Sequence, residues 1–139
     1  MQQRDILKDQ IEQLGRVLGK IIAEFLDLKL QGEVGLGIKQ TRKSLQEQLD
    51  IDVEKLLLLN EQDLLSYLNE RNLIGAHAEM IADYLLDVGS HILPTDPEIG
   101  KKYLNKTRDL YEVSNQLSDS LSLERIKKAT KIEQMLRDT

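Results

Sequence analysis

The stretch QQRDILKDQIEQLGRVLGKIIAEFLDLKL, residues 2–30, decides the fold class. Its apolar side chains recur at alternating spacings of four and three residues, which is the heptad pattern of one helix face. They are Leu7, Ile11, Leu14, Leu18, Ile21, Phe25 and Leu28. Ile22 and Leu26 widen this seam, which favours packing into a bundle. We therefore predict one long helix, about 43 Å in length. A compact domain of this chain length is about 37 Å across, so the helix protrudes, bends at Gly15 or Gly19, or packs against a second copy.

Composition extends the helical prediction to the whole chain of 139 residues. Leucine and isoleucine supply 38 residues, whereas there are five valines, four tyrosines, one phenylalanine and no tryptophan. Leucine loses little rotamer freedom in a helix, while β-branched and aromatic residues favour sheets. The absence of cysteine excludes disulfides, thiolate metal sites and a cysteine nucleophile. No signal-peptide pattern or apolar run of membrane-spanning length is visible, so we expect a cytoplasmic protein with no membrane contact.

Breaks between periodic segments divide the remaining chain into further helices. Three glycines between residues 32 and 37 end the first helix, and Pro94 and Pro97 bound a turn near residue 95. Asn60 and Asp96 are expected N-caps. The predicted helices cover residues 34 or 38–49, 52–58, 61–70, 75–93, 97–118 and 122–137. The last helix is expected to bury Leu123, Ile126, Ala129, Ile132 and Leu136. We predict an all-α fold of six to seven helices in a single domain, 1–139, with residues 1–31 as the long N-terminal helix and 60–139 as helical hairpins.

Two resemblances to known families follow from these segments. In the segment ending at Pro94, the spacing of Ala82, Leu86 and Gly89 resembles the second helix of a tetratricopeptide repeat. The preceding helix departs from that pattern, because Ser66 and Glu70 stand where an aromatic residue and a glycine are usual. The pairs 61–70/75–93 and 97–118/122–137 nevertheless share a helix–turn–helix layout with a period near 36 residues. Separately, QIEQLGRVLGKII, residues 10–22, resembles the start of a family of small, uncharacterised bacterial helical proteins. That resemblance implies a bacterial, non-catalytic helical protein.

Charge is distributed unevenly along the chain. Residues 1–43 and 97–139 each carry a net charge of +2, while residues 44–96 carry −9. An acidic centre disfavours broad contact with nucleic acid, which needs concentrated positive charge. It suits a partner with a basic patch or subunits that pack head to tail, and a solvated acidic face is the alternative.

No constellation of residues predicts catalysis or a bound cofactor. Asp83, Asp87 and His91 align at i, i+4 and i+8 on one helix, with Glu79 extending the row, and they are weak candidates for a divalent-metal site. Because the row lies opposite the apolar stripe, we expect it to face water and hold no metal. His77, near the start of the same helix, is expected at the surface. We therefore predict no catalytic residues, no cofactor-binding residues and no enzyme activity.

Two apolar surfaces are candidates for partner contact. The first is the seam of the long helix, represented by Leu7, Ile11, Leu14, Leu18, Ile21 and Phe25. The second is the run Leu56–Leu59, in which Leu57 and Leu58 are the candidates, because four consecutive leucines surround a whole helical turn. The leading hypothesis is a non-catalytic protein-interaction or assembly module, self-associating as a possible homodimer. The alternative is a regulatory domain that binds a small molecule or metal in a pocket between helices.

Overall fold

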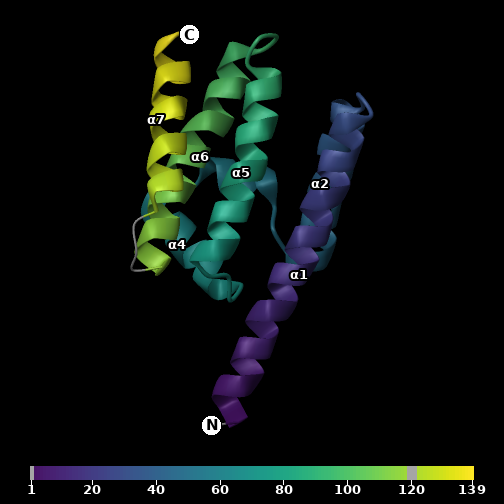
Figure 1. Cartoon of the computed structure of the whole chain (residues 1–139), viewed down its shortest axis with the longest axis vertical. Coiled ribbons are helices and arrows are strands. Elements are labelled where there is room, and N and C mark those ends of the chain that lie inside the picture. Colours follow the sequence, from purple (N-terminus) through teal and green to yellow (C-terminus); the bar gives the residue numbers. More distant parts are fainter. Residues whose placement is uncertain (1, 119–121) are drawn as a thin grey trace.

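The protein is all-helical, as predicted. The computed structural model describes residues 2–118 and 122–139, with side chains from residue 8 onward (Figure 1). The helices are α1 (Gln2–Leu30), α2 (Val34–Leu49), α3 (Val53–Leu58), α4 (Glu61–Glu70), α5 (Gly75–Ile92), α6 (Pro97–Ser118) and α7 (Leu123–Arg137). Within the described ranges there is no strand. The seven helices agree with the six to seven expected from the sequence, and most bounds agree within one residue.

Local side-chain chemistry sets the helix boundaries. Gly32 has φ +78° at the break after α1, a backbone conformation that glycine adopts without a Cβ penalty. The Asn60 side chain accepts a hydrogen bond from the Asp63 amide at 2.8 Å, which caps α4. The Asp96 carboxylate accepts from the Ile99 amide at 3.2 Å, in front of α6. Both predicted N-caps are therefore confirmed.

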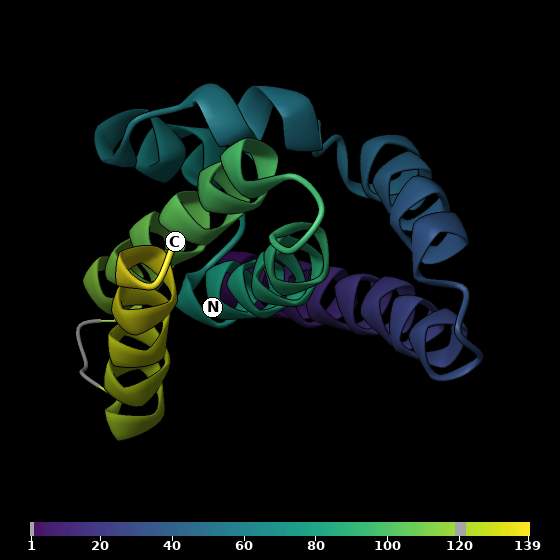
Figure 2. The ribbon, with the colours of Figure 1, turned by 90° about the horizontal axis from the view of Figure 1, so that it is seen from above.

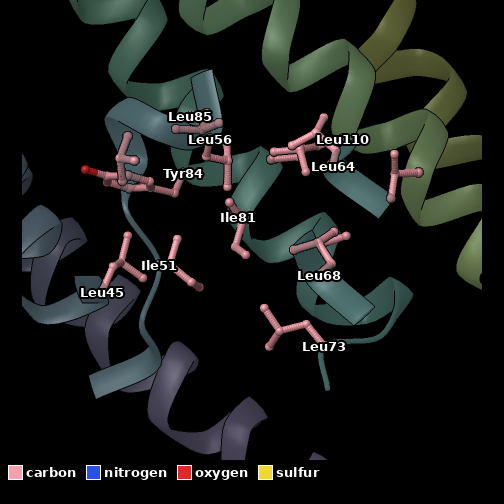
Figure 3. Packing of buried hydrophobic residues seen from close by; sticks show 14 of the residues in the cluster. Leu45, Ile51, Leu56, Leu64, Leu68, Leu73, Ile81, Tyr84, Leu85 and Leu110 are labelled. Atoms are coloured by element: carbon pink, nitrogen blue, oxygen red, sulfur yellow. The ribbon is translucent and has the colours of Figure 1, made fainter. Parts of the chain in front are cut away.

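Helix α5 lies at the centre of the molecule. Seen from above, α6 and α7 lie on one side of α5, α1 runs past it, and α3 and α4 lie across α6 (Figure 2). The closest helix pair is α5 with α6, and α1 pairs with α2. One apolar core draws leucines and isoleucines from all seven helices, and several of them are shown in Figure 3.

Glycine allows the close approach of α5 and α6. A Cβ added at Gly89 would lie 2.9 Å from the Tyr103 Cβ, and one at Gly100 would lie 2.6 Å from the Leu93 Cα. Both distances are too short for nonbonded carbon atoms, so neither position has room for a larger residue. The resemblance to tetratricopeptide repeats paired α5 with α4, whereas the closest partner of α5 is α6. That resemblance stays a prediction.

The seam of α1 packs inside the chain. Leu18, Ile21 and Phe25 are buried, and the Phe25 ring meets the Tyr84 ring edge to face at a centroid distance of 4.9 Å. The prediction that these three residues form a contact surface between chains is therefore wrong, because α2 and α5 of the same chain cover them. Ile11 and Leu14 are half-buried on the N-terminal part of α1, which protrudes beyond the bundle (Figure 1). The Leu7 side chain lies outside the described residues.

Helix α7 turns a different face to the core than its apolar pattern predicted. Leu123 is 76% exposed and Ile126 is 46% exposed, whereas Arg125 is buried. Arg125 forms an ion pair with Glu79 at 3.6 Å, and Lys128 with Asp83 at 3.0 Å. The prediction that Leu123 and Ile126 are buried is wrong, since the basic side chains of α7 face the acidic row of α5. Ile132, which is buried, follows the prediction.

No helix in the described part of the chain combines the length and the apolar character needed to cross a membrane.

Candidate interaction site

The run of four leucines, Leu56–Leu59, divides into buried and exposed members. Leu56 is buried in the core, and Leu57 and Leu59 are half-buried. Leu58 is 82% exposed, and Ile99 of α6 is 37% exposed. This split follows from helix geometry, because consecutive side chains on one short helix point in different directions. The sequence predicted that part of the run could contact a partner, and Leu57 and Leu58 remain candidates for that contact.

A cavity of about 280 Å³ opens beside these residues, between α2, α3 and α6. We call it the α3–α6 groove. Its walls combine aliphatic side chains with charged and phenolic groups. They are formed by Arg42, Glu54, Leu57, Leu58, Ile99, Lys102 and Tyr103. The groove can therefore bind an apolar group and an adjacent polar group together.

Lysine 106 fixes the leucine run against α6. Its side chain is buried, and its ammonium donates a hydrogen bond to the Leu59 carbonyl, at the C-terminal end of α3. The same ammonium forms an ion pair with Asp109 at 3.3 Å. Burying a lysine is costly unless its charge is paired and hydrogen-bonded, and both conditions are met here. The backbone at the end of α3 is thus held in one position relative to α6.

Arg42 forms the polar wall of the groove. One end nitrogen of its guanidinium lies 3.4 Å from the Glu54 carboxylate, whose side chain is 80% exposed. The other end nitrogen donates to the Tyr103 hydroxyl, and the guanidinium carbon lies 5.9 Å from the centre of the Tyr103 ring. Water screens an ion pair this exposed, so Glu54 is a weak partner for Arg42.

Two buried donors, one on Arg42 of the groove and one on Tyr84 of α5, lack an acceptor among the described residues. The Arg42 Nε and the Tyr84 hydroxyl are buried and have no hydrogen-bond partner among the described residues. The pKa of Tyr84 is raised, first by burial and then by Tyr103, while the Arg42 charge opposes the rise. Tyr84 does not line the groove but a separate cavity between α1 and α5. Leaving a buried donor unpaired costs about 1–3 kcal/mol, so each of these two groups lowers the stability of the fold.

The acidic row of α5, proposed as a weak metal site, is divided among cations from other helices. Glu79 and Asp83 form ion pairs with basic residues of α7. Asp87 forms an ion pair with Lys29 of α1 at 3.1 Å. His91 is exposed. Within residues 2–118 and 122–139, no group of three His, Asp or Glu side chains is arranged to hold a metal ion. The row is half-buried against α1 and α7, so the expectation that it simply faces water is wrong.

His77 is buried, although the sequence predicted it at the surface. Its Nδ1 accepts a hydrogen bond from the Ile74 amide at 2.9 Å, and its Nε2 lies 3.2 Å from the Ile11 carbonyl. The imidazole therefore carries its proton on Nε2 and links α5 to α1. Gly15 makes room for it, because a Cβ there would lie 3.4 Å from Nε2. Burial lowers the pKa of His77, and the Ile11 contact partly opposes that shift.

Sequence reasoning missed the polar half of the groove. Arg42 and Tyr103 come from two helices, α2 and α6, and no spacing in the sequence links them. One signal was available: buried tyrosines usually need a hydrogen-bond partner, and the chain has only four tyrosines.

Comparison with known proteins gives no family for this chain. No protein-family model matches it, and neither a curated protein nor a solved structure gives a match.

Proposed function

We propose that this chain is a non-catalytic protein-interaction module that holds an aliphatic side chain of a partner protein in the α3–α6 groove. The observation that carries the proposal is the 82% exposure of Leu58 beside the groove, next to half-buried Leu57 and exposed Ile99. Fully burying one leucine side chain gains about 1.5–3 kcal/mol. Such a residue beside a preformed recess fits the anchor-and-pocket arrangement of protein interfaces.

The size of the groove favours a protein segment over a free small molecule. Pockets for drug-sized ligands and cofactors have volumes of about 300–1,000 Å³. The groove, at about 280 Å³, lies just below that range and is large enough for a single aliphatic residue. At this groove the alternative of a small-molecule regulatory domain therefore has less support, although a cavity of about 670 Å³ beside α1 and Arg71 falls within that range. Its metal-binding version conflicts with the ion pairs that divide the acidic row of α5.

A second copy of the chain is the first partner to test. Self-association through Leu18, Ile21 and Phe25 would require opening the core, so we propose the groove, which carries exposed Leu58, as the self-contact. The acidic centre and basic ends of the chain favour a head-to-tail arrangement.

The test compares Leu58→Asp with a matched control, Leu123→Asp. Both leucines are more than three-quarters exposed, so both variants should fold like the wild type. A displayed library of random peptides is selected against the wild-type protein, and enriched peptides are then measured by fluorescence polarisation. Light scattering of the same three proteins gives the mass in solution.

The proposal predicts that enriched peptides share an aliphatic residue, and that Leu58→Asp weakens their binding about tenfold or more while Leu123→Asp does not. If the wild type self-associates, Leu58→Asp should lower the mass measured by light scattering, and Leu123→Asp should leave it unchanged. Equal binding to both variants would refute the assignment of the groove. A monomeric wild type that enriches no peptide would refute the proposed function.

A further inference from the structure

We propose that His77 is a pH-sensitive switch that holds the N-terminal arm of α1 against α5 while its imidazole is neutral and releases the arm when the imidazole is protonated. The α1 arm is residues 2–16, which precede Leu18, the first buried residue of α1 among those whose side chains the structure describes. The arm protrudes beyond the bundle (Figure 1). The switch shares no residue with the α3–α6 groove, so it does not depend on the proposed function.

The two ring nitrogens of His77 join the arm to the start of α5. The Nδ1 atom accepts from the Ile74 amide at 2.9 Å, and the Nε2 atom donates to the Ile11 carbonyl at 3.2 Å. A neutral imidazole accepts at one nitrogen and donates at the other, so both contacts require the neutral form. Within the described residues, no other side-chain hydrogen bond or ion pair joins the arm to another helix. The position of the arm therefore depends on this ring.

Protonation removes the acceptor at Nδ1. A charged imidazole carries a hydrogen on both nitrogens, so its Nδ1 would then present a donor to the Ile74 amide, which is also a donor. The His77 side chain is 3% exposed, and burying a charge without a partner is costly. Both effects favour a state in which the ring turns into water. Once it does, the Ile11 carbonyl loses its contact with α5 and the arm is free to separate.

The elements around His77 offer no buried acid to a protonated ring. On the α1 arm the charged side chains with described positions are all exposed, and they are Lys8, Asp9, Glu12 and Arg16. The charged residues that flank the ring in sequence are paired within the chain, Arg71 with Asp50 and Glu79 with Arg125. The α6 residues next to the start of α5 are uncharged, namely Ser114 and Ser118. In agreement, burial lowers the pKa of His77, and the Ile11 carbonyl opposes that shift only in part.

Release of the arm would also remove one wall of a cavity. A cavity of about 670 Å³ lies between the arm and the turn that follows α4. Five of its lining residues belong to the arm, and they are Asp9, Gln10, Gln13, Leu14 and Arg16. The facing wall is formed by Arg71 and Asn72. Acid would therefore open this cavity to water and expose the half-buried apolar side chains of the arm, Ile11 and Leu14.

The test measures the position of the arm in the full chain as the pH changes. The chain has no cysteine, so spin labels attach only at introduced cysteines. One pair, Asp9→Cys with Glu98→Cys, reports the arm, and a reference pair, Glu70→Cys with Glu98→Cys, reports the bundle; all three residues are exposed. Distances between the labels are measured by double electron–electron resonance at about pH 8 and about pH 5, on either side of the ordinary imidazole pKa of about 6.5. Nitrogen resonances of the ring give the protonation of His77 over the same range.

The arm pair should give one narrow distance distribution at the higher pH and a broad one at the lower pH, while the reference pair stays unchanged. The midpoint should follow the protonation of His77 and lie below about 6.5. His77→Gln should keep the arm in place at both pH values, because the glutamine amide does not titrate and still has a donor for the Ile11 carbonyl. His91→Gln is the matched control, since it changes the exposed histidine of the same helix and should behave like the wild type.

A second variant displaces the ring without titration. A Cβ at Gly15 would lie 3.4 Å from the His77 Nε2, so the branched side chain of Gly15→Val would occupy the space of the imidazole. This variant should show the broad arm distribution already at the higher pH, with the reference pair unchanged.

An arm pair that stays narrow while His77 becomes protonated would overturn the proposal. The same broadening in His77→Gln, or its absence in His91→Gln, would assign the effect to another group and would overturn it too. Broadening of both label pairs together would mean that acid unfolds the whole bundle, which also contradicts release of the arm alone. If His77→Gln does not fold, the wild type and Gly15→Val decide, and a narrow arm distribution in Gly15→Val would refute the role of the ring.

Discussion

Leu18→Ala tests whether the seam of α1 belongs to the core of one chain. Leu18 is fully buried. The substitution removes the equivalent of three carbon groups at about 0.8 kcal/mol each, and the cavity left behind adds to that loss. We expect the free energy of unfolding to fall by about 3 kcal/mol. For a chain of this length the entropy of unfolding is about 0.3 kcal/mol/K, so the melting temperature should fall by about 10 °C.

The measurement is thermal unfolding followed by circular dichroism at several protein concentrations. Leu30→Ala is the matched control, because the same residue type in the same helix is 86% exposed there and should lose less than about 0.5 kcal/mol. If the seam were instead an interface between chains, the wild-type melting temperature would rise with protein concentration. A dependence on concentration that Leu18→Ala abolishes would refute the assignment of the seam to the core. An equal loss of free energy of unfolding in Leu18→Ala and Leu30→Ala would refute it as well.

Three further predictions concern packing and titration. Gly100→Ala should destabilise the protein by about 1–3 kcal/mol in denaturant unfolding, because the new Cβ would meet the backbone of the α5–α6 turn, whereas Gly35→Ala has open space and should not. Burial lowers the pKa of His77, so its contribution to stability should be lost as the pH falls below about 6.5. The free energy of unfolding of His77→Gln, measured with denaturant, should therefore decline less than that of the wild type as the pH falls over that range. Burial is the main cause that raises the pKa of Tyr84 and of Tyr111. The stability of the protein should therefore fall as the pH rises above about 10. Tyrosinate absorbance should then show two residues that ionise only together with unfolding; titration of all four in the folded state would contradict this.

The sequence was sufficient for the helices because the signals that define them are local. Apolar periodicity and the caps at Asn60 and Asp96 act within a few residues, and the structure reproduces them. Which face of a helix packs is a different problem. The apolar pattern of α7 favoured Leu123 and Ile126, but the outcome depended on the acids of α5, about 45 residues away in the chain.

Only the apolar half of the groove could be predicted in the same way. Leu57 and Leu58 stood out because a short helix cannot bury four consecutive leucines. Arg42 and Tyr103 carried no comparable signal, since each has an ordinary local context and its place in the groove depends on tertiary packing. His77 was misplaced for a similar reason: its partner is the Ile11 carbonyl, 66 residues away.

The central position of α5 has a consequence for synthesis of the chain. Its closest partner, α6, begins at Pro97, and the cations that pair with Glu79 and Asp83 lie still later, at Arg125 and Lys128. A nascent chain that has reached only the end of α5 therefore has a long apolar helix without its main neighbour. Partly made chains of this kind expose surface that favours aggregation. Stable packing of α5 must therefore wait until α6 has left the ribosome.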